Sequence, residues 1–189
     1  MKIYEPKTFD IPELDGISNE TIEEHLALYE GYVKHFNLVH RVVEDSNNQD
    51  FVRREVYRRQ AFEYDGIKNH ELYFAQFEGG AKALSEDSSL YQKMSEGGMT
   101  YDIWVKIFRN LATTRGVGWA ILGYNEEDAT LIQYWVDEQH LGHLTSVKPI
   151  LVLDMWEHSY MLDHPPSEKE KYVDAFFQNL NWEVVNSRI

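Results

Sequence analysis

Asp154 and His158 are the residues of this sequence whose types and spacing most directly suggest chemistry. A carboxylate at a strand end and an imidazole four residues later, after a turn into helix, can face one point. His25 and His70 lie in two long helical segments among aromatic neighbours, where a buried imidazole needs a polar partner. Convergence of these four side chains would provide three nitrogens and one oxygen. That donor set suits iron or manganese and leaves room for a solvent ligand, although zinc accepts the same ligand types.

Spacing alone does not decide between such a site and a plainer interpretation. Taken singly, each helical histidine is more commonly a hydrogen-bonded core residue or a surface residue than a ligand. The pairs His35/His40 and His140/His143 are better explained by accidental spacing than by metal binding at the surface.

Composition excludes several other classes of site. The chain has 189 residues and no cysteine, which rules out disulfide scaffolds, thiolate metal sites and cysteine nucleophiles. With 32 acidic and 18 basic residues the formal net charge is -14, so we expect neither nucleic acid nor an anionic membrane as a partner. No run approaches the roughly 20 apolar residues of a membrane span, and Met1 to Asp10 does not resemble a secretion signal. We therefore expect a soluble, cytoplasmic protein.

Two long helices are predicted in the first part of the chain. From Ile22 to Phe36 apolar or aromatic residues recur every three or four positions, and Ser18 is the expected N-cap. After a polar turn at Asp45 to Asp50, a second helix is expected from Phe51 to about Phe77, with Gly66 in its interior. Helices joined by so short a turn should lie antiparallel.

The second part of the chain reads as mixed structure. A loop region is expected from Gly79 to Gly98, then a third helix from Tyr101 to Leu111 with Ile103, Trp104, Ile107, Phe108 and Leu111 on one face. The β-prone runs are Trp119 to Tyr124, Thr130 to Val136 and Ile150 to Asp154. Ser167 and Glu170 form a capping-box pattern for a last helix through Leu180.

These elements predict an α+β fold. An N-terminal antiparallel hairpin of long helices is followed by a small three-stranded antiparallel sheet surrounded by helices. We expect a helical hairpin lobe over residues 1–80 and an α/β lobe over residues 81–189, with the metal site between the two lobes.

Four motifs resemble the iron/manganese superoxide dismutase family in order and spacing, over about residues 14–186. They are Asn69-His70-Glu71-Leu72-Tyr73-Phe74, Gly116-Val117-Gly118-Trp119, Asp154-Met155-Trp156-Glu157-His158-Ser159-Tyr160 and Asn181-Trp182-Glu183. The resemblance implies four metal ligands, with water or hydroxide as a fifth, and these are His25, His70, Asp154 and His158. The metal would cycle between its divalent and trivalent states while superoxide is converted to oxygen and hydrogen peroxide. A trivalent site of about +1 net charge suits this small anion.

The resemblance also implies a glutamine that hydrogen-bonds the solvent ligand. In the iron-type pattern it stands four residues before the second-helix histidine, where this chain has Gly66. In the manganese-type pattern it follows the tryptophan of the glycine-x-glycine-tryptophan stretch, where this chain has Gln139. Manganese is therefore slightly favoured over iron. A shift of one residue would place His140 there instead, and the plain alternative makes Gln139 a turn residue.

Further residues take roles only through the same resemblance. Glu157 matches the glutamate that reaches a metal-bound histidine of the partner subunit, which implies a homodimer. Trp119, Trp156 and Phe74 would form the apolar surroundings of the site, a role compatible with ordinary core packing. Lys169 stands near the sequence position at which the family has an arginine that steers the substrate, so it is a candidate for that role. The cluster Arg53, Arg54, Arg58 and Arg59 is better read as a solvated helix face.

The first helix departs from the family pattern. The gateway tyrosine is expected eight residues after the first ligand, but Tyr32 follows His25 by seven, a shift of about 100° on a regular helix. Tyr32 can be the gateway only if the helix path differs locally, for instance through loss of a bulge. Tyr29 replaces a histidine that pairs with a partner-subunit tyrosine, and that tyrosine is replaced by Met161. We expect slower or altered proton delivery, because a thioether and a phenol cannot relay a proton as the family pair does.

The leading hypothesis is a metal-dependent superoxide dismutase. The alternative is a non-catalytic relative whose fold serves partner binding or assembly, a reading that the altered first helix supports. A hydrolytic zinc site ranks lower because no general base is evident.

Overall fold

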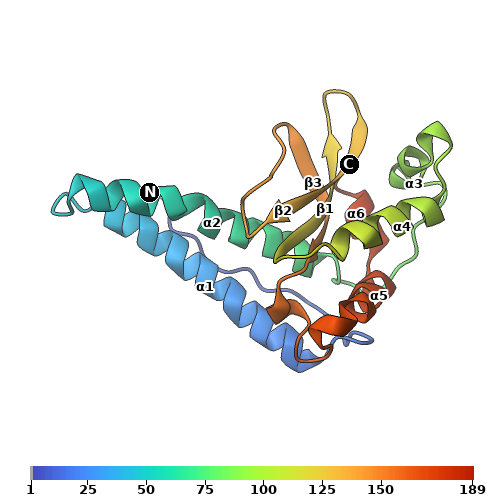
Figure 1. Cartoon of the computed structure of the whole chain (residues 1–189), viewed down its shortest axis with the longest axis horizontal. Helices are drawn as coiled ribbons and strands as arrows, with labels where there is room; N and C mark the ends of the chain where they lie inside the picture. The colour runs from blue at the N-terminus through green and yellow to red at the C-terminus, as the bar shows by residue number, and fades with distance from the viewer. Residues whose placement is uncertain (1) are drawn as a thin grey trace.

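The computed structural model describes residues 2–189, and two long helices form its most extended feature. Helix α1 spans Asn19–Glu44 and α2 spans Asp50–Ala75. They close on each other at the tip of a hairpin and diverge toward the sheet, as Figure 1 shows. The Ser18 side chain accepts a hydrogen bond from the Thr21 backbone N–H, which confirms the predicted N-cap of α1. The two helices pack against each other, which confirms the predicted antiparallel hairpin.

The buried face of α1 follows the predicted periodicity. His25, Tyr29, Val33 and Phe36 are all 3% exposed or less. The helix is α-helical along its whole length. Residues spaced four and seven positions apart on an unbroken α-helix share one face, because seven residues rotate a side chain by about 700°, close to two full turns.

Three antiparallel strands form the sheet. They are β1 (Gly118–Asn125), β2 (Thr130–Asp137) and β3 (Val147–Asp154), arranged in the order β2-β1-β3. The β1–β3 register pairs Trp119 with Asp154. This pairing places a carboxylate at the end of β3 beside an indole, and β3 packs against α2. The predicted three-stranded sheet is confirmed.

Short helices surround the sheet and complete the α+β fold (Figure 1). The α-helices are α3 (Ser89–Met94), α4 (Tyr101–Ala112), α5 (Lys169–Asn179) and α6 (Trp182–Asn186). The 3-10 turns are η1 (Glu96–Gly98), η2 (Glu157–Ser159) and η3 (Pro166–Glu168). The sequence predicted α4 and α5 but missed α3, which lies within the expected loop region, and α6.

One local prediction was wrong. Ser167 does not cap α5: Pro166 begins the turn η3, and α5 starts two residues after Ser167 without a side-chain cap. A proline fits the first position of a helical turn, so the chain turns before the capping residue. On α4 only part of the predicted face is buried, since Ile103 and Ile107 remain 50% and 44% exposed.

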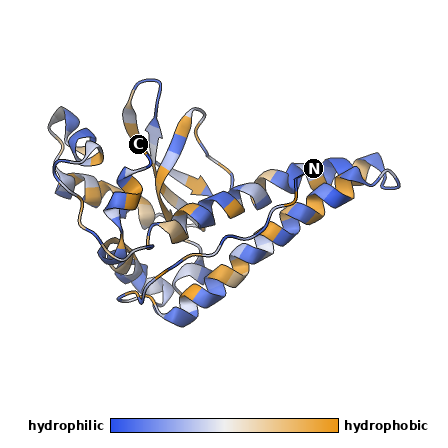
Figure 2. Cartoon of the chain, turned by 180° about the vertical axis from the view of Figure 1, so that it is seen from behind, coloured by the Kyte–Doolittle hydropathy of each residue, from blue (hydrophilic) through white to orange (hydrophobic). Residues whose placement is uncertain are grey.

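The core lies where the sheet, α2, α4 and α5 meet. Trp119, Phe74, Phe108 and Phe176 are fully buried there. Figure 2 shows hydrophobic and hydrophilic residues interspersed along both helices of the hairpin. Among residues 2–189, no helix combines the length and the apolar character needed to cross a membrane.

Candidate metal centre

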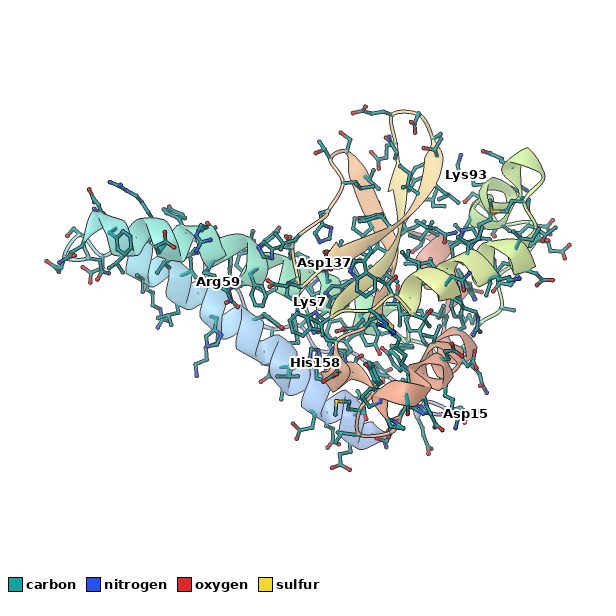
Figure 3. All side chains as sticks on the ribbon, viewed as in Figure 1. Lys7, Asp15, Arg59, Lys93, Asp137 and His158 are labelled. Carbon is teal, nitrogen blue, oxygen red and sulfur yellow. The ribbon has the colours of Figure 1, made fainter. Side chains whose placement is uncertain are left out.

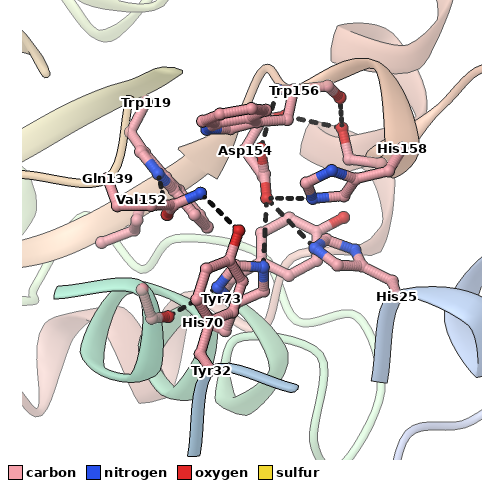
Figure 4. Close-up of polar contacts among 12 residues, drawn as sticks. His25, Tyr32, His70, Tyr73, Trp119, Gln139, Val152, Asp154, Trp156 and His158 are labelled. Carbon is pink, nitrogen blue, oxygen red and sulfur yellow. Dashed lines mark hydrogen bonds and ion pairs between the residues drawn. The ribbon is translucent and has the colours of Figure 1, made fainter. Parts of the chain in front are cut away.

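Four ligand atoms meet where the diverging helices reach the end of β3 (Figure 4). The Nε2 atoms of His25, His70 and His158 lie 3.1, 3.6 and 3.4 Å from Oδ2 of Asp154. All four atoms lie within 4.8 Å of one another. The structure thus brings together the four residues singled out from the sequence.

Neighbouring backbone groups orient the ligand side chains. Oδ1 of Asp154 accepts a 2.8 Å hydrogen bond from the Trp156 backbone N–H, which turns Oδ2 toward the histidines. Nδ1 of His70 donates to the Gly66 carbonyl oxygen at 2.6 Å. This bond places the His70 proton on Nδ1 and leaves Nε2 with a lone pair facing the cluster.

The protonation states fit a metal site. Burial lowers the pKa of His25, and burial is the largest cause that lowers the pKa of His70 to about 3, so both imidazoles are neutral. Burial alone would raise the pKa of Asp154, but His158 and His25 outweigh it and hold that pKa below its usual range. Neutral imidazoles and an ionised carboxylate are the forms that bind metals.

Unpaired atoms in the pocket support the same interpretation. Nε2 of His70 and Nε2 of His158 are buried and make no hydrogen bond. Buried ring nitrogens that make no hydrogen bond are costly unless another group satisfies them. A cation at the shared point would satisfy both atoms, so the donor set present fits a metal ion.

Gln139 lies beside the ligand cluster, and His140 does not take its place. The Gln139 side chain is fully buried, accepts a 2.9 Å hydrogen bond from Trp119 Nε1 and donates one of 2.9 Å to the Tyr32 hydroxyl. His140 instead has its ring 5.7 Å from that of Phe62. Gln139 therefore links β1 to the first helix at the edge of the ligand cluster.

Asn69 supports Gln139 and was missed by the sequence interpretation. Its side-chain amide donates a 3.0 Å hydrogen bond to the Gln139 carbonyl oxygen, and the residue is 2% exposed. The available signal was its place in the motif directly before the ligand His70.

Tyr32 reaches the pocket because α1 is a continuous α-helix. A spacing of seven residues keeps Tyr32 on the His25 face, and its ring centroid lies 5.0 Å from that of His70. A helix path without a bulge, the condition set by the sequence, therefore places Tyr32 beside His70. Burial raises the pKa of Tyr32, and the charges of Asp154 and Glu63 add to that effect.

Aromatic rings enclose the ligands. Trp119 lies 5.0 Å from the His70 ring, Phe74 lies 4.9 Å from the His25 ring and Trp156 stacks 5.8 Å from the His158 ring. Trp119 and Phe74 are fully buried. These rings keep bulk water from the cluster and fix the imidazole orientations.

Tyr29 is engaged within its own chain. Its hydroxyl accepts a 2.9 Å hydrogen bond from the Lys7 backbone N–H and contacts Oε1 of Glu71 at 3.4 Å. Met161 is 47% exposed, and Glu157 is exposed beside His158. The Tyr29 hydroxyl therefore ties α1 to the N-terminal segment and to α2.

Lys169 and the arginines of α2, the other charged residues considered from the sequence, make contacts outside the ligand cluster. Lys169 donates a 2.7 Å hydrogen bond to the Thr114 carbonyl oxygen. Arg53 and Arg58 form ion pairs of 2.5 and 3.0 Å with Asp50 and Glu55 of the same helix. Arg59 lies along the hairpin, whereas His158 lies at its base (Figure 3).

Comparison with known proteins points in one direction. Residues 86–188 match the family described as iron/manganese superoxide dismutases, C-terminal domain. The chain is 36% identical to superoxide dismutase [Fe] of Aquifex pyrophilus, over 97% of this chain and 90% of that protein. It is 35% identical to the Aquifex aeolicus protein of the same name, with the same coverage. It is 27% identical to mitochondrial superoxide dismutase [Mn] of Glossina morsitans morsitans, over 91% of this chain and 81% of that protein. The chain belongs to the iron/manganese superoxide dismutase family.

Proposed function

We propose that this chain catalyses the dismutation of superoxide at a mononuclear iron or manganese site held by His25, His70, Asp154 and His158. The observation that carries the proposal is the convergence of three Nε2 atoms on Oδ2 of Asp154, with all four atoms within 4.8 Å. The relatives compared above are named as iron or manganese superoxide dismutases.

An iron or manganese ion held by His25, His70, Asp154 and His158 would supply the one-electron redox chemistry that converts two superoxide ions and two protons into oxygen and hydrogen peroxide. The residues of this chain bind the metal ion, orient its ligands and supply protons. One anionic carboxylate and three neutral imidazoles leave the pocket with a positive net charge once a trivalent ion is bound, which favours a small anion.

Tyr32 and Gln139 are the proposed proton-handling pair. Gln139 donates to the Tyr32 hydroxyl, so the hydroxyl proton of Tyr32 remains free to point toward solvent or substrate in the pocket. Because Trp119 binds the other end of the Gln139 amide, the amide cannot flip without losing a buried hydrogen bond. The pair therefore holds a donor at a fixed place beside the cluster.

The choice between manganese and iron rests on two opposed observations. The glutamine beside the ligands is Gln139, the position that the manganese-type pattern uses. Both Aquifex relatives, by contrast, are named as iron enzymes. Nitrogen and carboxylate donors suit either metal. Reconstitution of metal-free protein with each metal, followed by superoxide consumption assays, identifies the one that supports turnover.

Variants at the ligands test the function itself. Protein loaded with its active metal should consume superoxide, and Asp154→Ala should lose both the metal and at least about 99% of the activity. Asp102→Ala, at an exposed position in the first turn of α4, is the matched control and should behave as wild type. Metal-free, inactive wild-type protein would instead support the non-catalytic alternative.

A homodimer is part of the proposal. Glu157 is exposed next to His158, and Met161 and Leu162 are 47% and 57% exposed nearby in the chain. A second copy placed against this surface would cover apolar side chains and bring a carboxylate to each His158. Sedimentation equilibrium should give twice the mass of the chain, and Glu157→Ala should weaken the association.

A further inference from the structure

The outer edge of β3 is closed by a side chain rather than by another strand. In the sheet order β2-β1-β3, β3 has a neighbour on one side only. On the other side, Gln76 donates a 2.8 Å hydrogen bond to the Val152 carbonyl oxygen and accepts one of 2.8 Å from the Val152 N–H. The Gln76 amide thereby mimics a paired strand residue and satisfies both backbone groups of Val152.

Arg188 joins the same contacts from the C-terminal end of the chain. Its Nη1 donates to the Ile150 carbonyl oxygen at 2.6 Å and to Oε1 of Gln76 at 3.3 Å. Its Nη2 donates to the Leu72 carbonyl oxygen at 2.9 Å. One guanidinium therefore touches α2, β3 and the glutamine that connects them.

The acceptors of Arg188 are neutral. Within residues 2–189, no carboxylate forms an ion pair with this guanidinium. Burial lowers the pKa of Arg188 to about 10, so the side chain still carries its charge at neutral pH. Leu72 lies in the last turn of α2, where carbonyl groups lack helical partners and the helix dipole is negative. A half-buried cation that donates to carbonyl groups of α2, β3 and Gln76 at this point stabilises the junction of helix and strand.

This junction lies only a few residues from two of the metal ligands along the chain. Gln76 follows His70 by six residues, about 9 Å along a helix. Val152 precedes Asp154 by two residues, about 7 Å along a strand. A change in how α2 lies against β3 therefore moves Nε2 of His70 relative to Oδ2 of Asp154, which are now 3.6 Å apart.

We propose that Arg188, acting through Gln76, is a positioning residue of the metal centre that holds α2 and β3 in the register at which His70 and Asp154 share one cation. The inference rests on the proposed metal site but goes beyond it, since Arg188 touches none of the four ligands. It predicts that a residue at the end of the chain controls metal affinity and ligand geometry.

The test compares three variants of the full chain. Arg188→Met removes the cation and keeps much of the side-chain volume, and Arg188→Lys restores a cation that can reach one carbonyl group. Arg109→Met is the matched control, because Arg109 pairs with Asp174 and covers the Phe177 ring, both of which belong to α5. The measurements are chelator competition for manganese and iron, and the visible absorption of the trivalent metal-loaded protein.

Arg188→Met should weaken metal affinity about tenfold, within the range for residues behind metal ligands, and should shift the absorption band. Arg188→Lys should recover most of both values. Arg109→Met should lower the melting temperature and leave affinity and absorption as in wild type. Arg188→Met with wild-type affinity and an unshifted band would overturn the inference.

A second variant and measurements on metal-free protein test the same junction independently. If Arg188→Met does not fold, Gln76→Met tests the same junction and should give the same affinity loss and band shift. In metal-free protein, Arg188→Met should speed amide exchange at Val152 by about tenfold and move the ring-nitrogen NMR signals of His70. Unchanged exchange and unchanged His70 signals would contradict the positioning role. Wild-type protein that binds no metal would count against the proposed function alone.

Discussion

Gly66 and the Tyr32 ring occupy adjoining space, so that a Cβ atom on Gly66 would lie 2.6 Å from Cδ1 of Tyr32. The absence of a side chain at Gly66 is therefore what lets Tyr32 lie against α2 and meet Gln139. A glutamine at position 66, as in the iron-type pattern, is incompatible with this placement of Tyr32.

Gly66→Ala should displace the Tyr32 ring and lower the rate of superoxide consumption severalfold, even though alanine favours helix by about 1 kcal/mol over glycine. Gly31→Ala is the matched control in α1, since a Cβ there meets no atom within 4 Å. That variant should be more stable by about 0.5–1 kcal/mol in urea unfolding, with an unchanged rate. Equal rates for the two variants would contradict the account of Tyr32.

The metal-free protein should lose stability on acidification. Burial is the largest cause that lowers the pKa of His70 from 6.5 to about 3. The unfolded chain therefore binds this proton first, and the stability present above about pH 6.5 is lost as the pH falls toward 3. Urea unfolding of metal-free protein at a series of pH values measures the slope.

His70→Gln should flatten that slope. His35→Gln is the control, because the His35 side chain is 58% exposed and lies away from the ligands, and this variant should keep the wild-type slope. A wild-type stability that does not change between about pH 7 and 5 would show that His70 is not held neutral by the fold.

Tyr29→Phe removes a hydroxyl that accepts from the Lys7 N–H and contacts Glu71. We expect the free energy of unfolding to fall by about 1 kcal/mol, as for loss of one internal hydrogen bond. Amide exchange at Lys7 should quicken in the same variant. Wild-type stability together with unchanged exchange at Lys7 would mean that the hydroxyl does not tie down the N-terminal segment.

Asp163 connects the loop after His158 to the start of α1. Its Oδ2 accepts from the Ser18 N–H at 2.8 Å and from the Thr21 hydroxyl at 2.6 Å. Burial would raise the pKa of Asp163, but the bonds from Thr21 and Ser18 lower it, so its contribution to stability is present above about pH 4 and lost below.

Asp163→Ala should destabilise the protein by about 1 kcal/mol at neutral pH, whereas Asp163→Asn, which retains an acceptor, should lose less. Thermal unfolding of the two variants at pH 7 and at pH 3 distinguishes them from wild type. If the loss for Asp163→Ala were as large at pH 3 as at pH 7, the carboxylate charge would have no part in it.

Local signals in the sequence were sufficient for much of the fold. The Ser18 cap and the α1 periodicity depend on neighbours within a few residues, and both were predicted. The failures came from effects outside that range. Ser167 was misread as a cap because Pro166 starts a separate turn, and the exposure of Ile103 on the apolar face of α4 was not predictable because periodicity does not reveal how much of a helix face the sheet covers.

The site was predictable in its residue types and less so in its geometry. Asp154 and His158 follow a strand end and a turn, so their convergence follows from local structure. The placement of Tyr32 depends on whether α1 contains a bulge, and that of Gln139 on its contact with Trp119 across the sheet. The closure of β3 by Gln76 and Arg188 joins segments from 38 to 112 residues apart, which no pattern in one sequence reveals.

The most direct test of the central claim is a count of metal ions per chain combined with pulsed electron paramagnetic resonance of the Mn²⁺-loaded protein. The account predicts one ion per chain, with nitrogen couplings from three imidazoles that each vanish on replacement of His25, His70 or His158. Bound manganese without imidazole couplings, or couplings that survive all three replacements, would contradict it.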